Sequence, residues 1–348
     1  MKIVNPEAKI MSRLGKTDYE FVERIGRICY KSEDAITPDS SVKFIKGLKA
    51  RSHWAMLEHC ILRFEMDYDL FIDLASEMIK QTDKRDVECI KYLRITGNAK
   101  HVILSGSFRG FYDYLKLVVD FPNRSMSHYV GNIIYELVEH YPELFGEFRL
   151  DDFYVQVLEE TKRRFKGDKH LPTLITPREF EQMVQDAMES GCISEQEVLI
   201  PHCAYTMIFT CDRGVSHELV RHRPCSFAQE STRYCNYSKD KFGNEITVIK
   251  PVFFQEGSKQ YELWKKAVDT AESAYFDLLL SGAKPQEARS VLPNSLKTEI
   301  VVTAYEDEWA HILNLRYHGT TGAPHPQMKE IMDLAVPLLI TASHCRLP

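Results

Sequence analysis

Two amphipathic helices and one strand are predicted in the first 66 residues. Apolar residues recur at helical spacing after Asp18 and again after Ser40, and both residues are of a type favoured at helix starts. Residues 60–66 alternate between apolar and polar positions, which is typical of a strand with one buried face. The buried face is expected to carry Leu62, Phe64 and Met66, and the other face Arg63 and Glu65.

The stretch from residue 67 to residue 200 has a different pattern. Four of its segments have apolar residues at helical spacing, and polar or proline-containing loops separate them. These segments are residues 70–81, 110–121, 127–141 and 178–191. We therefore predict a mainly helical segment between about residues 67 and 200.

Strands and helices alternate again after residue 200. Residues 204–210 and 245–251 have the apolar pattern of strands, whereas residues 216–223 and 258–282 have that of helices. Ser258 suits the start of the last helix, and Gly282 suits the position just past its end. No internal repeat or low-complexity tract interrupts this pattern.

Composition and charge favour an enzyme over a membrane or nucleic-acid-binding protein. The 348 residues are 44% hydrophobic and 27% charged, which is enough for a substantial core. No apolar run approaches twenty residues and the first residues lack the apolar stretch of a signal peptide, so we expect a cytoplasmic protein with no membrane contact. The net charge of -6 and the absence of an extended basic stripe argue against a nucleic-acid partner.

Cysteine and histidine spacing predicts neither a disulfide framework nor a metal site. The nine cysteines include no C-x-x-C pair, and most are expected to be buried free thiols. His202 and His217 lie near Cys203 and Cys211 in the sequence, but their spacing fits no zinc template. A G-x-G-x-x-G loop is also absent, so a dinucleotide would have to bind by another fold.

The residues from 221 to 234 form a dense cationic segment. Arg221-His222-Arg223 is followed after seven residues by Ser231, and Arg233-Tyr234 comes next. The planar guanidinium group suits phosphates and carboxylates, and a serine hydroxyl with neighbouring backbone N–H groups could complete a phosphate-binding loop. The other interpretation is a surface cluster that pairs with Glu218 and Glu230.

The cationic segment resembles the signature of the flavin-dependent thymidylate synthase family. Three further segments resemble family segments in the same chain order, namely residues 52–66, 292–305 and 312–331. The resemblance implies an α+β fold, an antiparallel sheet flanked by helices, in a homotetramer whose active sites lie between subunits. One family domain would then span residues 1–348 as a long form, interrupted by a mainly helical insertion at 67–200.

The resemblance also implies an activity, the methylation of dUMP to dTMP. Methylenetetrahydrofolate would donate the carbon, and NADPH would reduce the FAD cofactor. The residues matching FAD-binding positions are His53, Arg221, His222, Arg223, Gln229 and His311. The residues matching dUMP-binding positions are Glu218, Arg221, Gln229, Glu230, Ser231, Thr232, Arg233 and Arg316.

Arg316 matches the catalytic arginine of the family. A fixed guanidinium facing the uracil ring would favour negative charge on the ring and raise electron density at C5. The simpler interpretation of Arg316 is an arginine that interacts with the dipole at the end of a helix.

Two residues invite assignment as nucleophiles. Ser231 has no neighbouring base in the sequence, so we favour a role as a hydrogen-bond donor to phosphate. Cys225 is expected to be a packing residue, although a thiolate beside Arg223 could have a lowered pKa.

Several positions depart from the family pattern. Ala55 stands where a hydroxyl residue often contacts FAD, Glu299 replaces an arginine near the nucleotide, and residues 305–307 replace an Asn-x-Arg that holds the flavin. Asp307 would repel a diphosphate at close range. Two alternatives therefore stay open: a non-catalytic nucleotide- or RNA-binding relative that has lost the flavin site, and a methylase of another uridine nucleotide.

Overall fold

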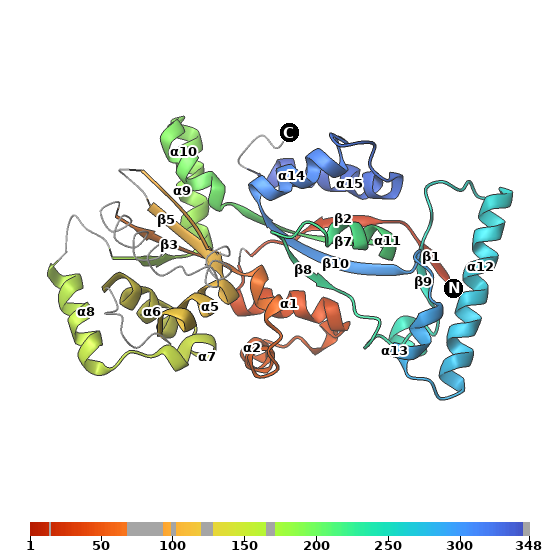
Figure 1. Ribbon diagram of the computed structural model, residues 1–348, viewed down its shortest axis with the longest axis horizontal. Helices are drawn as coiled ribbons and strands as arrows, with labels where there is room; N and C mark the ends of the chain where they lie inside the picture. The colour runs from red at the N-terminus through yellow and green to blue at the C-terminus, as the bar shows by residue number, and fades with distance from the viewer. Residues whose placement is uncertain (14, 68–92, 99–101, 120–127, 165–170, 344–348) are drawn as a thin grey trace. The chain divides into compact units, whose positions relative to one another are not determined.

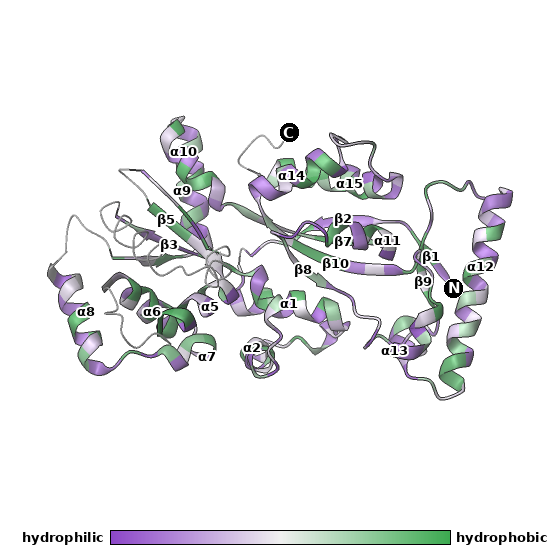
Figure 2. Cartoon of the chain, viewed as in Figure 1, coloured by the Kyte–Doolittle hydropathy of each residue, from purple (hydrophilic) through white to green (hydrophobic). Residues whose placement is uncertain are grey.

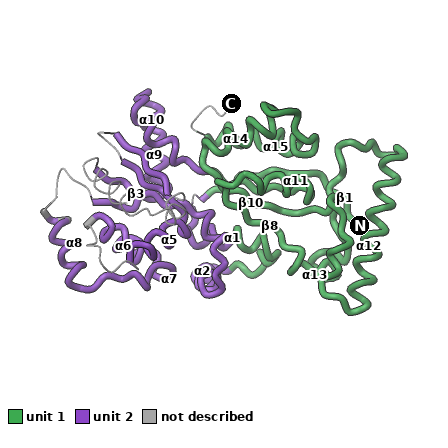
Figure 3. The backbone as a smooth tube through the Cα atoms, viewed as in Figure 1, with its two compact units in different colours: residues 1–12, 24–36, 205–348 green, residues 13–23, 37–204 purple. Residues whose placement is uncertain are grey.

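The computed structural model describes the chain except for residues 14, 68–92, 99–101, 120–127, 165–170 and 344–348 (Figure 1). The described residues form two compact units, which Figure 3 colours separately. Unit 1 consists of residues 1–12, 24–36 and 205–348, and unit 2 consists of residues 13–23 and 37–204. Antiparallel sheets and many helices confirm the predicted α+β class.

A four-stranded sheet lies at the centre of unit 1. Its strands, in spatial order, are β2 (Glu7–Ile10), β7 (Ala204–Asp212), β10 (Lys297–Tyr305) and β8 (Ser226–Gln229). β2 is antiparallel to β7, with Lys9 opposite Ile208, and β10 is antiparallel to β8. The hydroxyl groups of Thr206 and Thr303 join the two middle strands by a hydrogen bond of 2.7 Å.

Helices pack against this sheet and enclose the larger core of unit 1. They are α11 (Arg213–Leu219), α14 (Glu306–Arg316) and α15 (Pro326–Ala342). Trp309 of α14 is fully buried, and its indole Nε1 donates a hydrogen bond to the carbonyl of Tyr205 at 3.1 Å. The predicted strand at residues 204–210 is confirmed by β7, and the segment 292–305 contains β10.

A second part of unit 1 contains the long helix. The parallel pair β1 (Lys2–Val4) and β9 (Thr247–Ile249) shares a smaller core with α12 (Lys259–Leu280) and α13 (Pro285–Ala288). Ser258 caps α12 as predicted, because its hydroxyl accepts a hydrogen bond from the backbone N–H of Tyr261. Figure 2 shows that α12 mixes hydrophobic and hydrophilic residues along its length, as expected for a helix with one buried side.

Unit 2 is built on a second antiparallel sheet. Its strands, in spatial order, are β4 (Leu93–Gly97), β5 (Val102–Ser107), β3 (Ile61–Met66) and β6 (Thr173–Ile175). Its helices are α2 (Ser40–Ala50), α5 (Phe108–Val119), α6 (His128–His140), α7 (Pro142–Phe145), α8 (Asp152–Arg164), α9 (Pro177–Ser190) and α10 (Ile193–Leu199). A further helix, α1 (Asp18–Tyr30), contributes residues to both units.

Short 3-10 helices connect several of these elements. They cover Glu33–Ala35, Trp54–His59, Gly146–Phe148, Ile200–His202, Asp240–Phe242 and Arg289–Val291. Among the described helices of either unit, none is long and apolar enough to cross a membrane.

The segment predicted to be helical contains helices and also three strands that the sequence did not reveal. Helices α5, α6 and α9 confirm three of the four predicted segments, and the fourth, residues 70–81, lies outside the described residues. The additional strands β4, β5 and β6 pair around β3. β3 is therefore an inner strand of a sheet rather than a strand with one exposed face.

Arg63 shows why the predicted exposed face of β3 is wrong. Its side chain is buried, and its Nε and Nη2 atoms donate to the carbonyl of His202 at 3.0 and 2.7 Å. The ring of His202 is buried as well and forms hydrogen bonds with Ser105 at 2.6 Å and Thr96 at 2.7 Å. Burial, followed by the charges of Arg63 and Arg94, lowers the pKa of His202 to about 3.

Candidate functional site

The cationic segment begins where α11 ends. We predicted a helix over residues 216–223, but α11 starts at Arg213 and ends at Leu219. Its N-cap is Asp212, whose buried carboxylate accepts a hydrogen bond from the backbone N–H of Val215 at 2.7 Å. Because the helix stops early, Arg221 and Arg223 lie in the turn after it.

The turn exposes its two arginines and buries the histidine between them. His222 is 6% exposed, whereas Arg221 and Arg223 are both exposed. Neither guanidinium forms a hydrogen bond or an ion pair with any residue that the structure describes. Both groups are therefore available to an anionic ligand.

Arg316 joins this turn from the end of α14. Its Nη1 donates to Glu218 at 3.1 Å, and its Nε donates to Nε2 of His222 at 3.2 Å. The ring of His311, one turn earlier on α14, meets the ring of His222 edge to face at 5.8 Å. Four predicted site residues on two helices and a turn thus lie together, and the remaining amino group of Arg316 bonds to no described residue.

The electrostatics of this cluster keep His222 neutral. Burial, followed by the positive charge of Arg316 and the presence of His311, lowers the pKa of His222 to about 4. A neutral ring can accept the hydrogen bond from Arg316 at Nε2. The guanidinium is therefore held at two of its nitrogen atoms, by one carboxylate and one neutral ring.

Gln229, at the end of β8, is held by the fold. Its side-chain amide nitrogen donates to Ser216 of α11 at 2.8 Å and to Thr298 of β10 at 3.1 Å. The side chain thereby ties β8 to the neighbouring strand and helix. Its amide N–H groups are used within unit 1, which leaves the carbonyl oxygen for a ligand.

The loop from Ser231 to Arg233 uses many of its own backbone donors. The N–H of Ser231 donates to the carbonyl of Cys29 at 3.1 Å, and the hydroxyl of Ser231 accepts from the N–H of Arg233 at 3.4 Å. Phosphate binding by this loop stays a prediction, and it would depend on side chains more than on the backbone N–H groups of Ser231 and Arg233. Arg233 is exposed and its guanidinium lies over the ring of Tyr234.

Arg289 is a residue of this loop region that sequence reasoning missed. Its Nη1 donates to the hydroxyl of Thr232 at 3.3 Å. It begins the short helix before residues 292–305 and lies 57 positions from its partner in the sequence. In the sequence, Arg289 is marked only by its place three residues before the segment 292–305, which resembles a family segment.

Glu230 takes part in a buried group of charges. The residue is 4% exposed, and its carboxylate pairs with Lys297 at 3.2 Å and with Lys31 at 3.9 Å. Both lysines also pair with Glu299. Lys31, Glu230 and Lys297 line a cavity of about 510 Å³, together with Tyr237. The side chain of Glu230 therefore points into this charged group, and neither lysine was identified from the sequence.

Cys225 is a packing residue, as expected. It belongs to the main core of unit 1 and is 8% exposed. Burial, followed by the carboxylates of Glu308 and Asp307, raises the pKa of its thiol to about 12. The interpretation of Cys225 as a thiolate with a pKa lowered by Arg223 is thus wrong. Among the described residues, no group of three or more His, Cys, Asp or Glu side chains is placed to hold a metal ion.

Comparison with known proteins identifies the family. The model of a family described as "Thymidylate synthase complementing protein" matches residues 155–341, more than half of the chain. The chain belongs to this family. The match begins inside the segment predicted as an insertion, and the limits 67 and 200 of that insertion stay a prediction.

Curated relatives of the chain are named flavin-dependent thymidylate synthase. Those of Pyrococcus furiosus and Geobacter sulfurreducens are each 34% identical, over 121 and 125 residues, which is 34% and 36% of this chain. The protein of Sulfurisphaera tokodaii is 34% identical over 163 residues, covering 47% of this chain and 60% of the relative. The chain spans about half the length of the first two relatives, 49% and 52%.

Solved structures with a likeness to the chain include a UMP/dUMP methylase, PolB from Streptomyces cacaoi, bound with 5-Br dUMP. Its sequence is 20% identical, the likeness covers 48% of this chain and 77% of that chain, and the TM-score is 0.35. The same methylase bound with 5-Br UMP is 21% identical with the same TM-score.

Glu299 and the acidic residues at 306 and 307, which depart from the family pattern, have different surroundings. Glu299, which replaces an arginine, is paired with Lys31 and Lys297, so its negative charge is compensated within unit 1. Glu306 is buried and accepts a hydrogen bond from the hydroxyl of Tyr205 at 3.1 Å. Asp307 is exposed. It lies close enough to Cys225 to raise the pKa of that thiol, and thus adds negative charge beside the cationic turn.

His53 belongs to unit 2, unlike the other predicted site residues. It is exposed and precedes the 3-10 helix Trp54–His59. Its assignment to the flavin site stays a prediction.

Proposed function

We propose that the protein is a flavin-dependent thymidylate synthase that methylates dUMP to dTMP. Methylenetetrahydrofolate would supply the carbon, and NADPH would supply the electrons through bound FAD. Membership of the family supports this proposal, because curated relatives carry that name. The observation that carries it is the arrangement of Arg316, which is fixed by Glu218 and neutral His222 beside two arginines without protein partners.

The residues of the turn fit an anionic dinucleotide. Arg221 and Arg223 offer two guanidinium groups that no described residue neutralises, and the ring of His311 lies beside them on α14. These groups would hold the diphosphate of FAD, with the carbonyl oxygen of Gln229 as a further contact. The flavin supplies the hydride chemistry when bound, and the protein supplies binding and orientation.

The substrate would bind between the loop Ser231–Arg233 and Arg316. The hydroxyl groups of Ser231 and Thr232 and the guanidinium of Arg233 would hold the phosphate, and Arg221 would contact both ligands. Arg289 would add a second positive charge through its bond with Thr232. Glu230 would hold the loop in position through its ion pair with Lys297.

Arg316 would stabilise the uracil ring as negative charge develops on it. Nε and Nη1 are bonded to His222 and Glu218, so the side chain is orientated before the substrate binds. The other amino group is left to donate to the ring. Preorganised donors of this kind act without rearrangement during the reaction, which makes them effective in stabilising a transition state.

The proposal extends to assembly and location. In a homotetramer with active sites between subunits, residues of more than one chain would complete each site, and the protein would act in the cytoplasm. In this arrangement the family domain spans residues 1–348 and the segment 67–200 interrupts it.

The test is a direct assay of the purified protein. Flavin absorbance, identified as FAD after release, would separate the enzyme from a non-catalytic nucleotide-binding relative. Conversion of dUMP to dTMP that requires both methylenetetrahydrofolate and NADPH is the expected result, with UMP as the comparison substrate. A protein that binds dUMP without flavin and without turnover would overturn the proposal, and preferred methylation of UMP would correct the substrate.

A further inference from the structure

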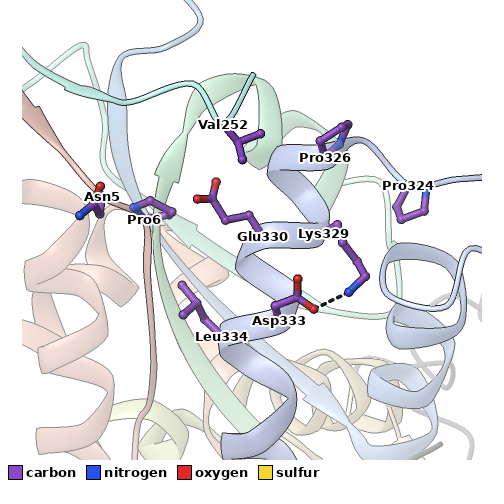
Figure 4. A pocket seen from close by; sticks show the side chains of 9 residues that line it. All are labelled: Asn5, Pro6, Val252, Pro324, Pro326, Lys329, Glu330, Asp333 and Leu334. Atoms are coloured by element: carbon purple, nitrogen blue, oxygen red, sulfur yellow. Dashed lines mark hydrogen bonds and ion pairs between the residues drawn. The ribbon is translucent and has the colours of Figure 1, made fainter. Parts of the chain in front are cut away.

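A pocket of about 670 Å³ opens on unit 1 beside the first turns of α15 (Figure 4). Three of its walls are the first turns of α15, the residues just before that helix, and the connection between β1 and β2. The fourth is Val252, which follows β9 in the chain. Most of the wall is apolar, formed by Pro6, Val252, Pro324, Pro326 and Leu334. Val252 and Leu334 are 50% and 41% exposed, so the pocket presents these side chains to its contents.

Among the charged residues that line this pocket, Glu330 is the one without a partner in the described part of the chain. Its Oε2 atom is buried, yet Glu330 forms no hydrogen bond or ion pair with any residue that the structure describes. Figure 4 shows its carboxylate turned away from Lys329 and toward the space near Pro6 and Val252. A buried carboxylate oxygen without a donor is costly, because it has lost water and gained nothing in exchange.

The charged neighbours of Glu330 do not neutralise it. Lys329 pairs with Asp333 and lies over the ring of Tyr317, 4.0 Å from its centre. Asp212, at the start of α11, accepts hydrogen bonds from Val215 and Gln327. The surroundings of Glu330 therefore contribute negative charge from two further carboxylates.

The same surroundings act on the pKa of Glu330. Burial, followed by the charges of Asp212 and Asp333, raises it above its ordinary value. His325 is the residue just before α15. It opposes the rise that burial causes in the pKa of Asp212, and its ring packs edge to face on Phe253. A positively charged ligand would offset the cost of burying the negative charge and would reduce the repulsion between the carboxylates, whereas an anion would increase that repulsion.

We propose that this pocket is a binding site for a small organic cation whose guanidinium or ammonium group is held by Glu330 and whose apolar body lies against Pro6, Val252 and Leu334. The apolar wall selects the body, and the negative charge of the Glu330 carboxylate that lines the pocket selects the charged N–H donor. The site is separate from the residues proposed to bind dUMP and FAD, so it does not depend on the proposed function.

The pair butylguanidinium and butylurea tests this assignment. The two compounds have nearly the same shape, but only the first is charged. Calorimetric titration at neutral pH should show saturable binding of butylguanidinium and binding of butylurea weaker by about tenfold or more. Equal binding of the two, or no saturable binding of butylguanidinium, would overturn the proposal.

Substitution of Glu330 locates the binding. Glu330→Gln keeps the shape and removes the charge, and it should weaken butylguanidinium binding by about tenfold or more. Glu262→Gln on exposed α12 changes the net charge equally, lies outside the pocket, and should leave binding unchanged. Equal affinity in wild type and Glu330→Gln, or equal loss in both variants, would contradict a site at Glu330. Thermal unfolding of each variant confirms that the fold is retained.

The pH dependence of the affinity shows whether Glu330 binds a cation as a carboxylate or a neutral hydrogen-bond acceptor as a protonated acid. If Glu330 binds a cation, lowering the pH protonates the carboxylate, and the affinity for butylguanidinium should fall. The groups that can also titrate near it are Asp212, Asp333 and His325, so the comparison is made against Glu330→Gln. Affinity that rises on acidification in the wild type would show that protonated Glu330 donates to an acceptor, and would refute the proposal.

Discussion

Arg316 donates a hydrogen bond from Nη1 to the carboxylate of Glu218 at 3.1 Å, which ties the end of α14 to the end of α11. The side chains of both residues are largely buried, 24% and 28% exposed, so solvent screens the pair less than it would on an open surface. The contact fixes the direction of a guanidinium that is also bonded to His222. Orientation of Arg316 is thus a property of unit 1 itself.

Replacement of Arg316 by lysine should separate the two halves of the proposed reaction. Lysine keeps the positive charge but loses the planar group that reaches Glu218, His222 and a ligand together. Methylation of dUMP should fall by about a hundredfold or more, because the interaction is proposed to be stronger in the transition state. Flavin reduction by NADPH should change little. Stopped-flow measurement of both half-reactions with saturating dUMP provides the comparison.

Glu218→Gln is the companion substitution for Arg316. It keeps a hydrogen-bond acceptor for Nη1 and removes the charge, so methylation should fall less than in Arg316→Lys. Equal losses of methylation and of flavin reduction in Arg316→Lys would show that Arg316 is an ordinary arginine at a helix end.

Replacement of Arg223 by alanine should release flavin without unfolding the protein. The guanidinium of Arg223 is exposed and bonds to no described residue, so its removal costs the fold little. Flavin content per protein chain is measured by absorbance after gel filtration, with thermal unfolding as the check on the fold. Arg178→Ala, at another exposed arginine near the start of α9, serves as the control. Unchanged flavin content in Arg223→Ala would remove this residue from the cofactor site.

Replacement of Ser231 by alanine should weaken dUMP binding by about 1.5–3 kcal/mol, the usual size for a hydrogen bond to a charged group. Its hydroxyl accepts only a long hydrogen bond from Arg233, so the local structure should survive. Residual turnover at saturating dUMP is expected. Ser273→Ala, exposed on α12, is the control. Complete loss of turnover with normal dUMP affinity would instead make Ser231 a nucleophile.

Acid should destabilise the protein through His202 before many carboxylates are protonated. The pKa of His202 is about 3 in the fold, against 6.5 for an ordinary histidine, so the unfolded chain binds the proton first. The contribution of His202 to stability is constant above pH 6.5. Below that value it should fall by about 1.4 kcal/mol per pH unit until the pH approaches the folded pKa.

Urea unfolding of the wild type and of His202→Gln at several pH values isolates this contribution. The difference between the two proteins should shrink as the pH falls below 6.5, the ordinary pKa of histidine. NMR of the His202 ring in the wild type supplies a second measurement that does not depend on the variant folding. A ring that becomes protonated near its ordinary pKa would contradict the burial of this residue in an unprotonated state.

Local sequence patterns predicted several elements well, and burial explains the main failures. Helix α12 was found because Ser258 and its apolar spacing are local signals. β5 was missed because all six of its residues are buried, which removes the alternation that marks a half-exposed strand. The start of α11 was misplaced because Ser216 looked like a cap, whereas Asp212 forms the capping bond.

The sequence identified the arginines of the candidate site, but it did not identify the residues with which the site's side chains pair. Arg221, Arg223 and Arg316 were identified from the signature and the helix end. The sequence contained no sign that Glu299 would pair with Lys31, a residue 268 positions away, or that Thr232 would bond to Arg289. Such pairs arise when the chain folds back on itself, and a single sequence carries no record of which distant charges meet.

The pairing of β2 with β7 has a consequence for the order of events during synthesis. Lys9 lies opposite Ile208, so the ribosome must add about 200 residues before the first strand of the central sheet meets its neighbour. All of unit 2 is synthesised in that interval and can form its own core first. Closing so long a loop carries an entropic cost that a preformed unit 2 reduces, because folded residues shorten the effective loop. Early folding of unit 2 would therefore make it easier for the nascent chain to close the central sheet.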